Sequence, residues 1–361
     1  MTNSRFTFSA VDVFLSSSTS TSVVTDVEVD SKLPSVSDEK KDFFTTVLQV
    51  LNKMPFKSGK EINGALEKAY TNGDRKYVYQ KSRYFQPKES LFPSYDACAI
   101  KGTSFVVTAG PQDAKEVAML LRLIQQEGIN EVIVLGREIG IDYAPGSEFV
   151  DYFTGEKRKK EKYDDFEFSI ERISGQVETS GNFHVPHGIL QSCLTLPNDF
   201  KVNVAFYSLP DMRFIDFDVK HIRGTKYWPN REDGVPFQQS TEERKEFFWQ
   251  QFQKYLQGKK ILVHCSAGLG RSGHVVFMFE ILKHYHEIFI DNNDPQKAAN
   301  LIHDILKRVR ENRPALVFTQ DQFMKAIENA HQLRAYALEK KYIQEVVPQP
   351  VISRRCGCAV M

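Results

Sequence analysis

One short run in the second half of the chain constrains the fold more than any other feature. Residues 263–273 read V-H-C-S-A-G-L-G-R-S-G, in which small or flexible residues separate Cys265 from Arg271. The preceding residues 260–263 read K-I-L-V, and their three consecutive branched apolar side chains predict a buried strand. Residues 275–282 are apolar and predict a buried helix. A strand, a glycine-rich loop and a helix in this order form a cradle for a phosphate group, because backbone N–H groups and the positive end of the helix face the loop.

The side chains of this loop predict its chemistry. A free thiol has a pKa of ~8.5, and a helix N-terminus with a nearby cation lowers it to roughly 3.5–7.5, so Cys265 is expected to be a thiolate that attacks phosphorus. Arg271 can hold two phosphate oxygens in a bidentate fork. Ser272 can donate a hydrogen bond to the sulfur and ease its departure. The residues between them are expected to bind the phosphate: Ser266, Ala267, Gly268, Leu269 and Gly270.

The loop resembles the signature H-C-x5-R-[S/T]-G of cysteine-dependent protein tyrosine phosphatases. It is most similar to the form H-C-S-A-G-x-G-R-[S/T]-G of the tyrosine-specific branch. The resemblance extends over about residues 41–335. It implies an α/β (α+β) fold, a single catalytic domain in which helices flank a twisted, mixed central sheet. It also implies hydrolysis of phosphotyrosine in a protein substrate through a phosphocysteine intermediate, with no metal ion and no other cofactor.

A second segment, residues 228–236, resembles the family's mobile W-P-D-x-G-V-P loop, which carries the general acid. This chain reads W-P-N-R-E-D-G-V-P, with two extra residues before Gly-Val-Pro. Counted from Trp-Pro, the acid position holds Asn230, which cannot donate a carboxylic proton. Counted back from Gly-Val-Pro, it holds Glu232. We expect Asp233 to be the acid, with Glu232 as the alternative, because closure of a lengthened loop can bring either carboxylate inward.

Two more segments resemble family motifs. The segment K-S-R-Y is similar to K-N-R-Y, which implies that Tyr84 stacks on the phenol ring of the substrate. The alternative for Tyr84 is an ordinary half-buried aromatic. The segment R-P-A-L-V-F-T-Q-D-Q-F resembles R-x-x-M-V-Q-T-x-x-Q-[Y/F], whose first Gln orients the water that hydrolyses the phosphocysteine. Phe318 holds that position here, so we expect Gln322 or Gln320 to position the water.

The chain ends C-G-C-A-V-M, and its last four residues form a C-a-a-X box. Methionine at the last place favours a farnesyl group on Cys358, added by a eukaryotic prenyltransferase. Cys356 is available for a palmitoyl group, and a second lipid makes membrane residence stable. We therefore expect a lipid anchor at the cytoplasmic face of a membrane, in a host cell if the protein is a bacterial effector, and a cytoplasmic protein otherwise. The alternative is a tail with stray cysteines.

Composition favours an intracellular enzyme. The chain has 361 residues, of which 26% are charged and 41% hydrophobic, as in folded proteins. A net charge of +1 gives no indication of a nucleic-acid partner. Five irregularly spaced cysteines argue against a disulfide framework, and His184 and His187 with Cys193 are too few ligands for a metal site. No secretory signal and no apolar run long enough to span a membrane are visible.

Three parts follow along the chain. Residues 1–38 are rich in Ser, Thr, Val and Asp without a period and predict a flexible tail. Residues 39–337 form the expected catalytic domain, beginning with an amphipathic helix from Phe43. Residues 338–361 are the expected tether that carries the terminal cysteines.

The sequence leaves alternative functions open beside an active tyrosine phosphatase. A catalytically weak module that binds phosphotyrosine is favoured by Asn230 and Phe318, which replace catalytic residues of the family. A phosphoinositide phosphatase fits a membrane tether. It does not fit the loop interior, where Ala267 and Leu269 add no positive charge.

Overall fold

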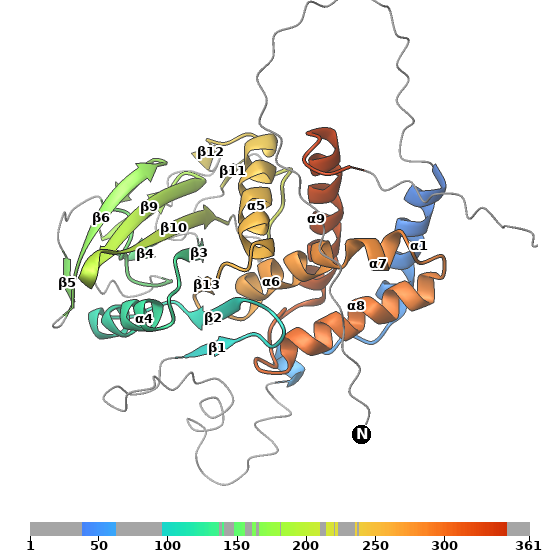
Figure 1. Cartoon of the computed structure of the whole chain (residues 1–361), viewed down its shortest axis with the longest axis horizontal. Helices are drawn as coiled ribbons and strands as arrows, with labels where there is room; N and C mark the ends of the chain where they lie inside the picture. The colour runs from blue at the N-terminus through green and yellow to red at the C-terminus, as the bar shows by residue number, and fades with distance from the viewer. Residues whose placement is uncertain are drawn as a thin grey trace, which may run out of the picture. The chain divides into compact units, whose positions relative to one another are not determined.

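An eight-stranded mixed sheet lies at the centre of the chain (Figure 1). This computed structural model describes residues 38–62, 96–136, 139–140, 148–155, 161–163, 166–180, 182–209, 214–219, 221–222, 235–236 and 238–344. The sheet has the order β1-β2-β13-β3-β10-β9-β6-β5. Its strands are β1 (Ala97–Ala99), β2 (Phe105–Ala109), β3 (Glu131–Gly136), β5 (Glu161–Tyr163), β6 (Phe166–Ser174), β9 (Ile189–Leu196), β10 (Phe200–Ser208) and β13 (Ile261–Cys265).

The middle of this sheet is parallel and its outer strands are antiparallel. Strand β13 pairs in parallel with both β2 and β3, and β3 pairs in parallel with β10. The pairs β1–β2, β10–β9, β9–β6 and β6–β5 are antiparallel. Parallel strands need covered faces on both sides, which the helices supply. Two small sheets complete the strands: β4 (Ile139–Gly140), β8 (Phe183–Pro186) and β7 (Val177–Ser180) in one, and β11 (His221–Ile222) with β12 (Val235–Pro236) in the other.

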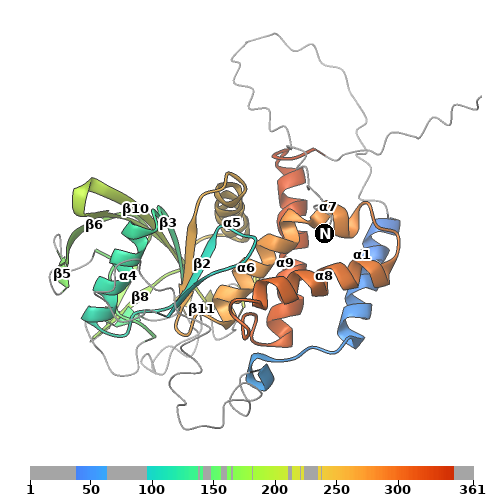
Figure 2. The same ribbon diagram turned by 60° about the horizontal axis from the view of Figure 1, so that its bottom comes forward.

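Helices cover both faces of the central strands. Figure 2 shows α4 on one side and α5 with α6 on the other. The helices are α1 (Asp38–Lys53), α4 (Ala114–Gln126), α5 (Thr241–Leu256), α6 (Gly270–Lys283), α7 (Tyr285–Phe289), α8 (Pro295–Arg310) and α9 (Gln320–Glu339), with a short 3-10 helix η1 (Pro197–Asp199). A mixed sheet flanked by helices confirms the predicted fold class.

Alternation along the strands divides the core in two. Successive strand residues point to opposite faces of a sheet. Apolar residues on one face pack with α4: Val106, Val132, Val134, Val204 and Leu262. Their neighbours on the other face pack with α5, α6, α8 and α9: Val107, Ile133, Leu135, Ala205 and Val263. Helix α6 is buried from Ser272 to Leu282, so other parts of the protein surround it on every side, as expected for a helix whose residues are apolar all round.

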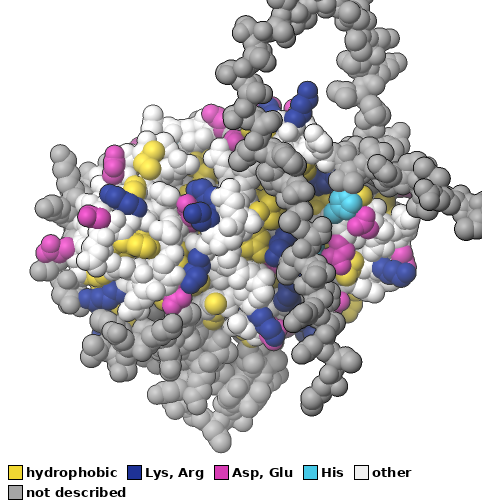
Figure 3. All heavy atoms as spheres, viewed as in Figure 1, with side chains coloured by type: hydrophobic (Ala, Val, Ile, Leu, Met, Phe, Trp, Pro, Cys, Tyr) yellow, Lys and Arg dark blue, Asp and Glu magenta, His cyan; other side chains and the backbone are white. Residues whose placement is uncertain are grey.

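The amphipathic helix predicted from Phe43 begins earlier, at Asp38. Charged and apolar side chains are interspersed over the described surface that Figure 3 shows. Among the described helices, none combines the length and the hydropathy that a membrane span needs.

Candidate active site

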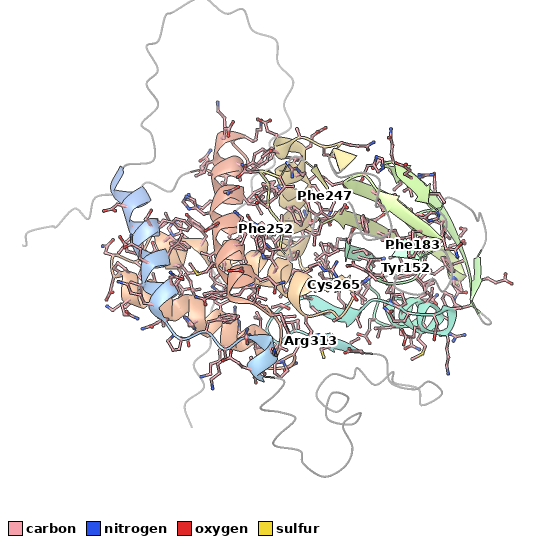
Figure 4. All side chains as sticks on the ribbon, turned by 180° about the vertical axis from the view of Figure 1, so that it is seen from behind. Tyr152, Phe183, Phe247, Phe252, Cys265 and Arg313 are labelled. Carbon is pink, nitrogen blue, oxygen red and sulfur yellow. The ribbon has the colours of Figure 1, made fainter. Side chains whose placement is uncertain are left out.

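Cys265 is the last residue of β13, where the chain leaves the middle of the sheet for α6 (Figure 4). Its side chain is buried, with 2% of the residue exposed. Burial raises the pKa of the thiol, but the charge of Arg271, the hydroxyl of Ser272 and the N–H groups of Ser272 and Leu269 lower it more. The pKa therefore lies below the ordinary value for cysteine, which favours a thiolate.

The four carbonyl groups of the loop that follows are directed outward. Each accepts a hydrogen bond from outside the loop: Ser266 from the N–H of Gly110 (2.9 Å), Ala267 and Gly268 from the guanidinium of Arg313 (3.2 and 2.7 Å), and Leu269 from the N–H of Val317 (3.1 Å). The C=O and N–H of one planar trans peptide point in opposite directions. The N–H groups of residues 267–270 therefore face the loop interior. Converging N–H groups can bind an anion, and phosphate binding by these residues stays a prediction.

Two glycines of the loop are required by its surroundings. Gly268 has a positive φ of 60°, and a Cβ there would lie 2.1 Å from the carbonyl oxygen of Thr108. A Cβ on Gly270 would lie 2.5 Å from the side-chain nitrogen of Gln322. A larger residue at Gly268 would push the loop away from the backbone of β2, whereas one at Gly270 would displace the end of the Gln322 side chain, so the compact loop depends above all on Gly268.

Arg271 lies in the first turn of α6 and is held by Glu148. Nη1 of Arg271 lies 2.6 Å from Oε2 of Glu148, and both side chains are largely buried. Burial lowers the pKa of Arg271, but the charges of Cys265 and Glu148 raise it, and the net effect is a raised pKa. A guanidinium has five N–H donors in one plane, so an ion pair on one side orients the others. Sequence reasoning missed Glu148, which lies outside any motif.

His264 and Tyr152 support the cysteine from the side of the sheet. Nδ1 of His264 lies 3.4 Å from the carbonyl oxygen of Cys265, and Nε2 lies 2.6 Å from the hydroxyl of Tyr152. Burial lowers the pKa of His264 to about 3, so the imidazole is neutral. The carbonyl contact requires the proton on Nδ1, and Nε2 therefore accepts from Tyr152. Tyr152 was not predicted from the sequence.

Arg313 joins the loop to strand β1. The residue is fully buried, and besides the two loop carbonyls it contacts Asp96 at 2.9 Å and the sulfur of Cys98 at 3.6 Å. Burial lowers its pKa, but the charge of Asp96 raises it more, so the guanidinium stays charged. The sequence places Arg313 in a segment that resembles a family motif. The structure shows that its guanidinium donates to the carbonyls of Ala267 and Gly268 and so holds them in place.

Gln322 lies beside the loop, and its carbonyl oxygen is engaged. Oε1 accepts from the N–H groups of Phe318 (2.9 Å) and Thr319 (3.1 Å), which closes a capping box at the start of α9. Gln320 is exposed and contacts Asn52 at 3.3 Å. Of the two candidates for positioning water, only Gln322 contacts the loop, and this role stays a prediction.

The ring of Phe318 packs against Gly59, in the segment that follows helix α1. The N–H of Gly59 donates to the carbonyl oxygen of Phe318 at 2.8 Å. A Cβ on Gly59 would lie 2.1 Å from the Phe318 ring, so the two residues are in direct contact. An aromatic ring at this position cannot orient water by a hydrogen bond.

Several predicted site residues lie outside the described residues. These are the acid candidates Asp233 and Glu232, the substrate-stacking candidate Tyr84 and the lipidation candidates Cys356 and Cys358. Of the segment 228–236, only strand β12 (Val235–Pro236) is described, and it pairs with β11 so that Ile222 lies opposite Val235.

Comparison with known protein families and solved structures shows what the chain is similar to. The family profile described as Protein-tyrosine phosphatase matches residues 77–331. No curated protein sequence matches the chain. Among solved structures, a Trypanosoma brucei protein tyrosine phosphatase, TbPTP1, is similar with 14% identity and a TM-score of 0.45, covering 85% of this chain and 93% of that one. PTPN18 in complex with HER2 phosphopeptides is similar with 16% identity and a TM-score of 0.49, covering 81% and 98%.

Proposed function

The chain belongs to the protein-tyrosine phosphatase family, and from this premise we propose that it is an active enzyme that hydrolyses phosphotyrosine in protein substrates. One observation carries the proposal: the pKa of Cys265 is lowered inside a cradle of backbone N–H groups that Arg271 closes. A module that only binds phosphotyrosine needs the cradle and the arginine but has no use for a nucleophilic thiolate.

The proposed reaction has two steps. In the first, the sulfur of Cys265 attacks phosphorus, and the bond from phosphorus to the tyrosine oxygen breaks as Asp233 or Glu232 supplies a proton. The N–H groups of residues 267–270 and the guanidinium of Arg271 bind the phosphoryl oxygens. In the second step, water attacks the phosphocysteine and phosphate leaves, with Gln322 as the candidate for positioning the water. The sulfur departs as a thiolate, which Ser272 stabilises.

A second candidate function is a catalytically weak phosphotyrosine-binding domain. Phe318 favours it, because the ring that contacts Gly59 offers no hydrogen bond to the hydrolytic water. Such a domain would hold phosphotyrosine without turning it over. A phosphoinositide phosphatase is less well supported, since Ala267 and Leu269 leave the loop interior without added positive charge.

The decisive experiment compares the wild type with Cys265→Ser on p-nitrophenyl phosphate and on a phosphotyrosine peptide. We expect the variant to lose turnover and keep peptide binding, because the N–H groups and Arg271 remain. Turnover of the variant within tenfold of wild type would exclude Cys265 as the nucleophile. Binding of the peptide with almost no turnover in the wild type would favour the weak binding domain.

The same protein is proposed to be tethered to a membrane. The support is the terminal C-a-a-X box with Cys358 as the farnesyl acceptor and Cys356 as a second acylation site. One lipid binds a membrane reversibly, and two hold the protein there. The proposed substrate is then a phosphotyrosine protein at the cytoplasmic face of that membrane.

A further inference from the structure

A buried carboxylate and a buried imidazole meet beside the active site and take no part in the steps above. Oδ2 of Asp151 lies 2.6 Å from Nδ1 of His184, and the hydroxyl of Thr154 donates to the same oxygen. Oδ1 accepts from the N–H groups of Phe153 (3.0 Å) and Thr154 (2.9 Å). The side chains of His184 and Asp151 are only 2% and 12% exposed. Burial raises the pKa of Asp151, but these contacts lower it more, so the carboxylate stays charged.

This pair sits on the segment that supports the catalytic loop. Asp151 directly precedes Tyr152, whose hydroxyl contacts His264. Glu148, the partner of Arg271, lies three residues earlier. Three side chains of the segment 148–154 therefore make polar contacts with other parts of the fold: Glu148 with Arg271, Asp151 with His184, and Tyr152 with His264.

The third contact comes from a different part of the fold than the first two. His184 belongs to β8 of the small sheet β4-β8-β7, which is separate from the central sheet. Figure 4 labels Tyr152 and Phe183, the neighbour of His184, on the same side of Cys265. Because Asp151 caps the turn that contains Tyr152 with bonds to Phe153 and Thr154, fixing its carboxylate fixes the backbone of that turn. The small sheet thus has a direct connection to the residues that hold the active loop.

We propose that Asp151 and His184 are a positioning pair, which holds Glu148 and Tyr152 against the catalytic loop and so maintains the reactivity of Cys265. The proposal rests on the proposed function in that Cys265 is taken as the nucleophile. Without the pair, Glu148 would no longer hold Arg271 in one orientation, and the thiolate would lose part of the charge that stabilises it. The phosphate would also lose part of its bidentate grip.

Two substitutions at His184 separate positioning from mere burial. The side-chain nitrogen of Asn occupies nearly the place of Nδ1 of His, so His184→Asn keeps a donor for Asp151. His184→Leu fills similar space and removes the donor. The measurement is the pH midpoint for alkylation of Cys265 by iodoacetamide, followed by mass spectrometry of the peptide that contains it. We expect a midpoint near wild type for His184→Asn and about one unit higher for His184→Leu.

Kinetics give a second readout of the same change. One unit in the thiol midpoint lowers the thiolate fraction about tenfold at a pH below both midpoints. We expect kcat/KM of His184→Leu on p-nitrophenyl phosphate at such a pH to fall by about that factor, with a rise in KM from the weaker grip of Arg271. His184→Asn should restore both values toward wild type.

A matched control lies beside the same small sheet. Nε2 of His187 lies 3.3 Å from a carboxylate oxygen of Glu178 on strand β7. His187→Leu therefore makes the same chemical change without touching the positioning pair. We expect its thiol midpoint and its kcat/KM to equal those of wild type.

The outcomes are distinct. If folded His184→Leu keeps the wild-type thiol midpoint, the proposal is overturned, even if its melting temperature drops. If that variant does not fold, Asp151→Asn removes the carboxylate that His184 contacts while keeping its size, and an unchanged midpoint in that variant overturns the proposal equally. Alkylation needs no phosphate substrate, so the pair can be tested even in an inactive protein. If the wild type shows no turnover and His184→Leu still has a raised thiol midpoint, the positioning pair is supported and the proposed function is refuted.

Discussion

At the scale of single residues, Arg313 shows how much of the site depends on a side chain that never touches the substrate. It is fully buried and donates to the carbonyls of Ala267 and Gly268 as well as to Asp96. Without these donors, two loop carbonyls would be free to turn inward, where they would repel the oxygens of a phosphate. The outward orientation of the loop carbonyls is therefore imposed from outside the loop.

We expect Arg313→Met to lower kcat/KM by more than tenfold and to destabilise the fold. A buried acceptor left without its donor costs about 1–3 kcal/mol, and this substitution leaves two such carbonyls. Urea denaturation and turnover of p-nitrophenyl phosphate measure the two effects. Arg122→Met on α4 removes a cation of the same type at a distance from the loop and should leave turnover unchanged. Full activity in Arg313→Met would show that the loop holds its shape unaided.

A second residue-scale prediction concerns the general acid. We expect Asp233→Ala to lower kcat by about 10²–10⁴-fold at neutral pH, which is the usual size of a general-acid contribution. The loss should shrink for aryl phosphates with good leaving groups, because these need no proton. A larger loss in Glu232→Ala would move the assignment by one residue. Equal, small losses in both variants would mean that neither carboxylate acts as the acid.

At the scale of secondary-structure elements, the start of α9 is coupled to the catalytic loop. Thr319 and Gln322 form a capping box there, and the side chain of Gln322 lies against Gly270 at the start of α6. A helix cap is commonly a matter of stability alone. Here Gln322 both completes the capping box and lies beside the catalytic loop, so one side chain belongs to the helix cap and to the site.

We expect Thr319→Ala to lower the free energy of unfolding by about 1 kcal/mol and also to slow turnover, since Gln322 loses its fixed position. Asp294→Ala is the matched control: Asp294 caps α8 by accepting from Gln296 and Lys297, at the end of α8 that lies against Met54. Both variants should lose similar stability in urea denaturation, and only Thr319→Ala should lose kcat. Equal kinetics in the two variants would contradict the coupling.

At the scale of the whole molecule, the proposed location depends on the C-terminal cysteines. We expect Cys358→Ser to move the protein from the membrane fraction to the cytosol of a eukaryotic cell, because the C-a-a-X box has no other acceptor for a prenyl group. Cys356→Ser should weaken retention without abolishing it, since a single lipid binds reversibly. Fractionation of a tagged protein measures both. Retention of Cys358→Ser equal to wild type would mean that another feature holds the protein at the membrane.

Turnover on a soluble peptide provides the control for these variants. Helix α9 ends at Glu339, and both cysteines follow it by more than a dozen residues. Neither substitution alters a residue of the described active site, so kcat/KM should equal that of wild type. A loss of activity in solution would indicate that the C-terminal segment contributes to catalysis as well as to location.

The sequence by itself determined the parts of this protein that are contiguous in the chain. The strand, the loop from Cys265 to Arg271 and the helix after it are local, so small residues, periodicity and a helix N-terminus suffice to predict an anion site with a nucleophile. Only the tertiary structure decided which residues hold that loop. Glu148 meets Arg271 across 123 residues of sequence, and Tyr152 meets His264 across 112. Such partners are chosen by how the strands and helices pack, and no local pattern encodes that choice.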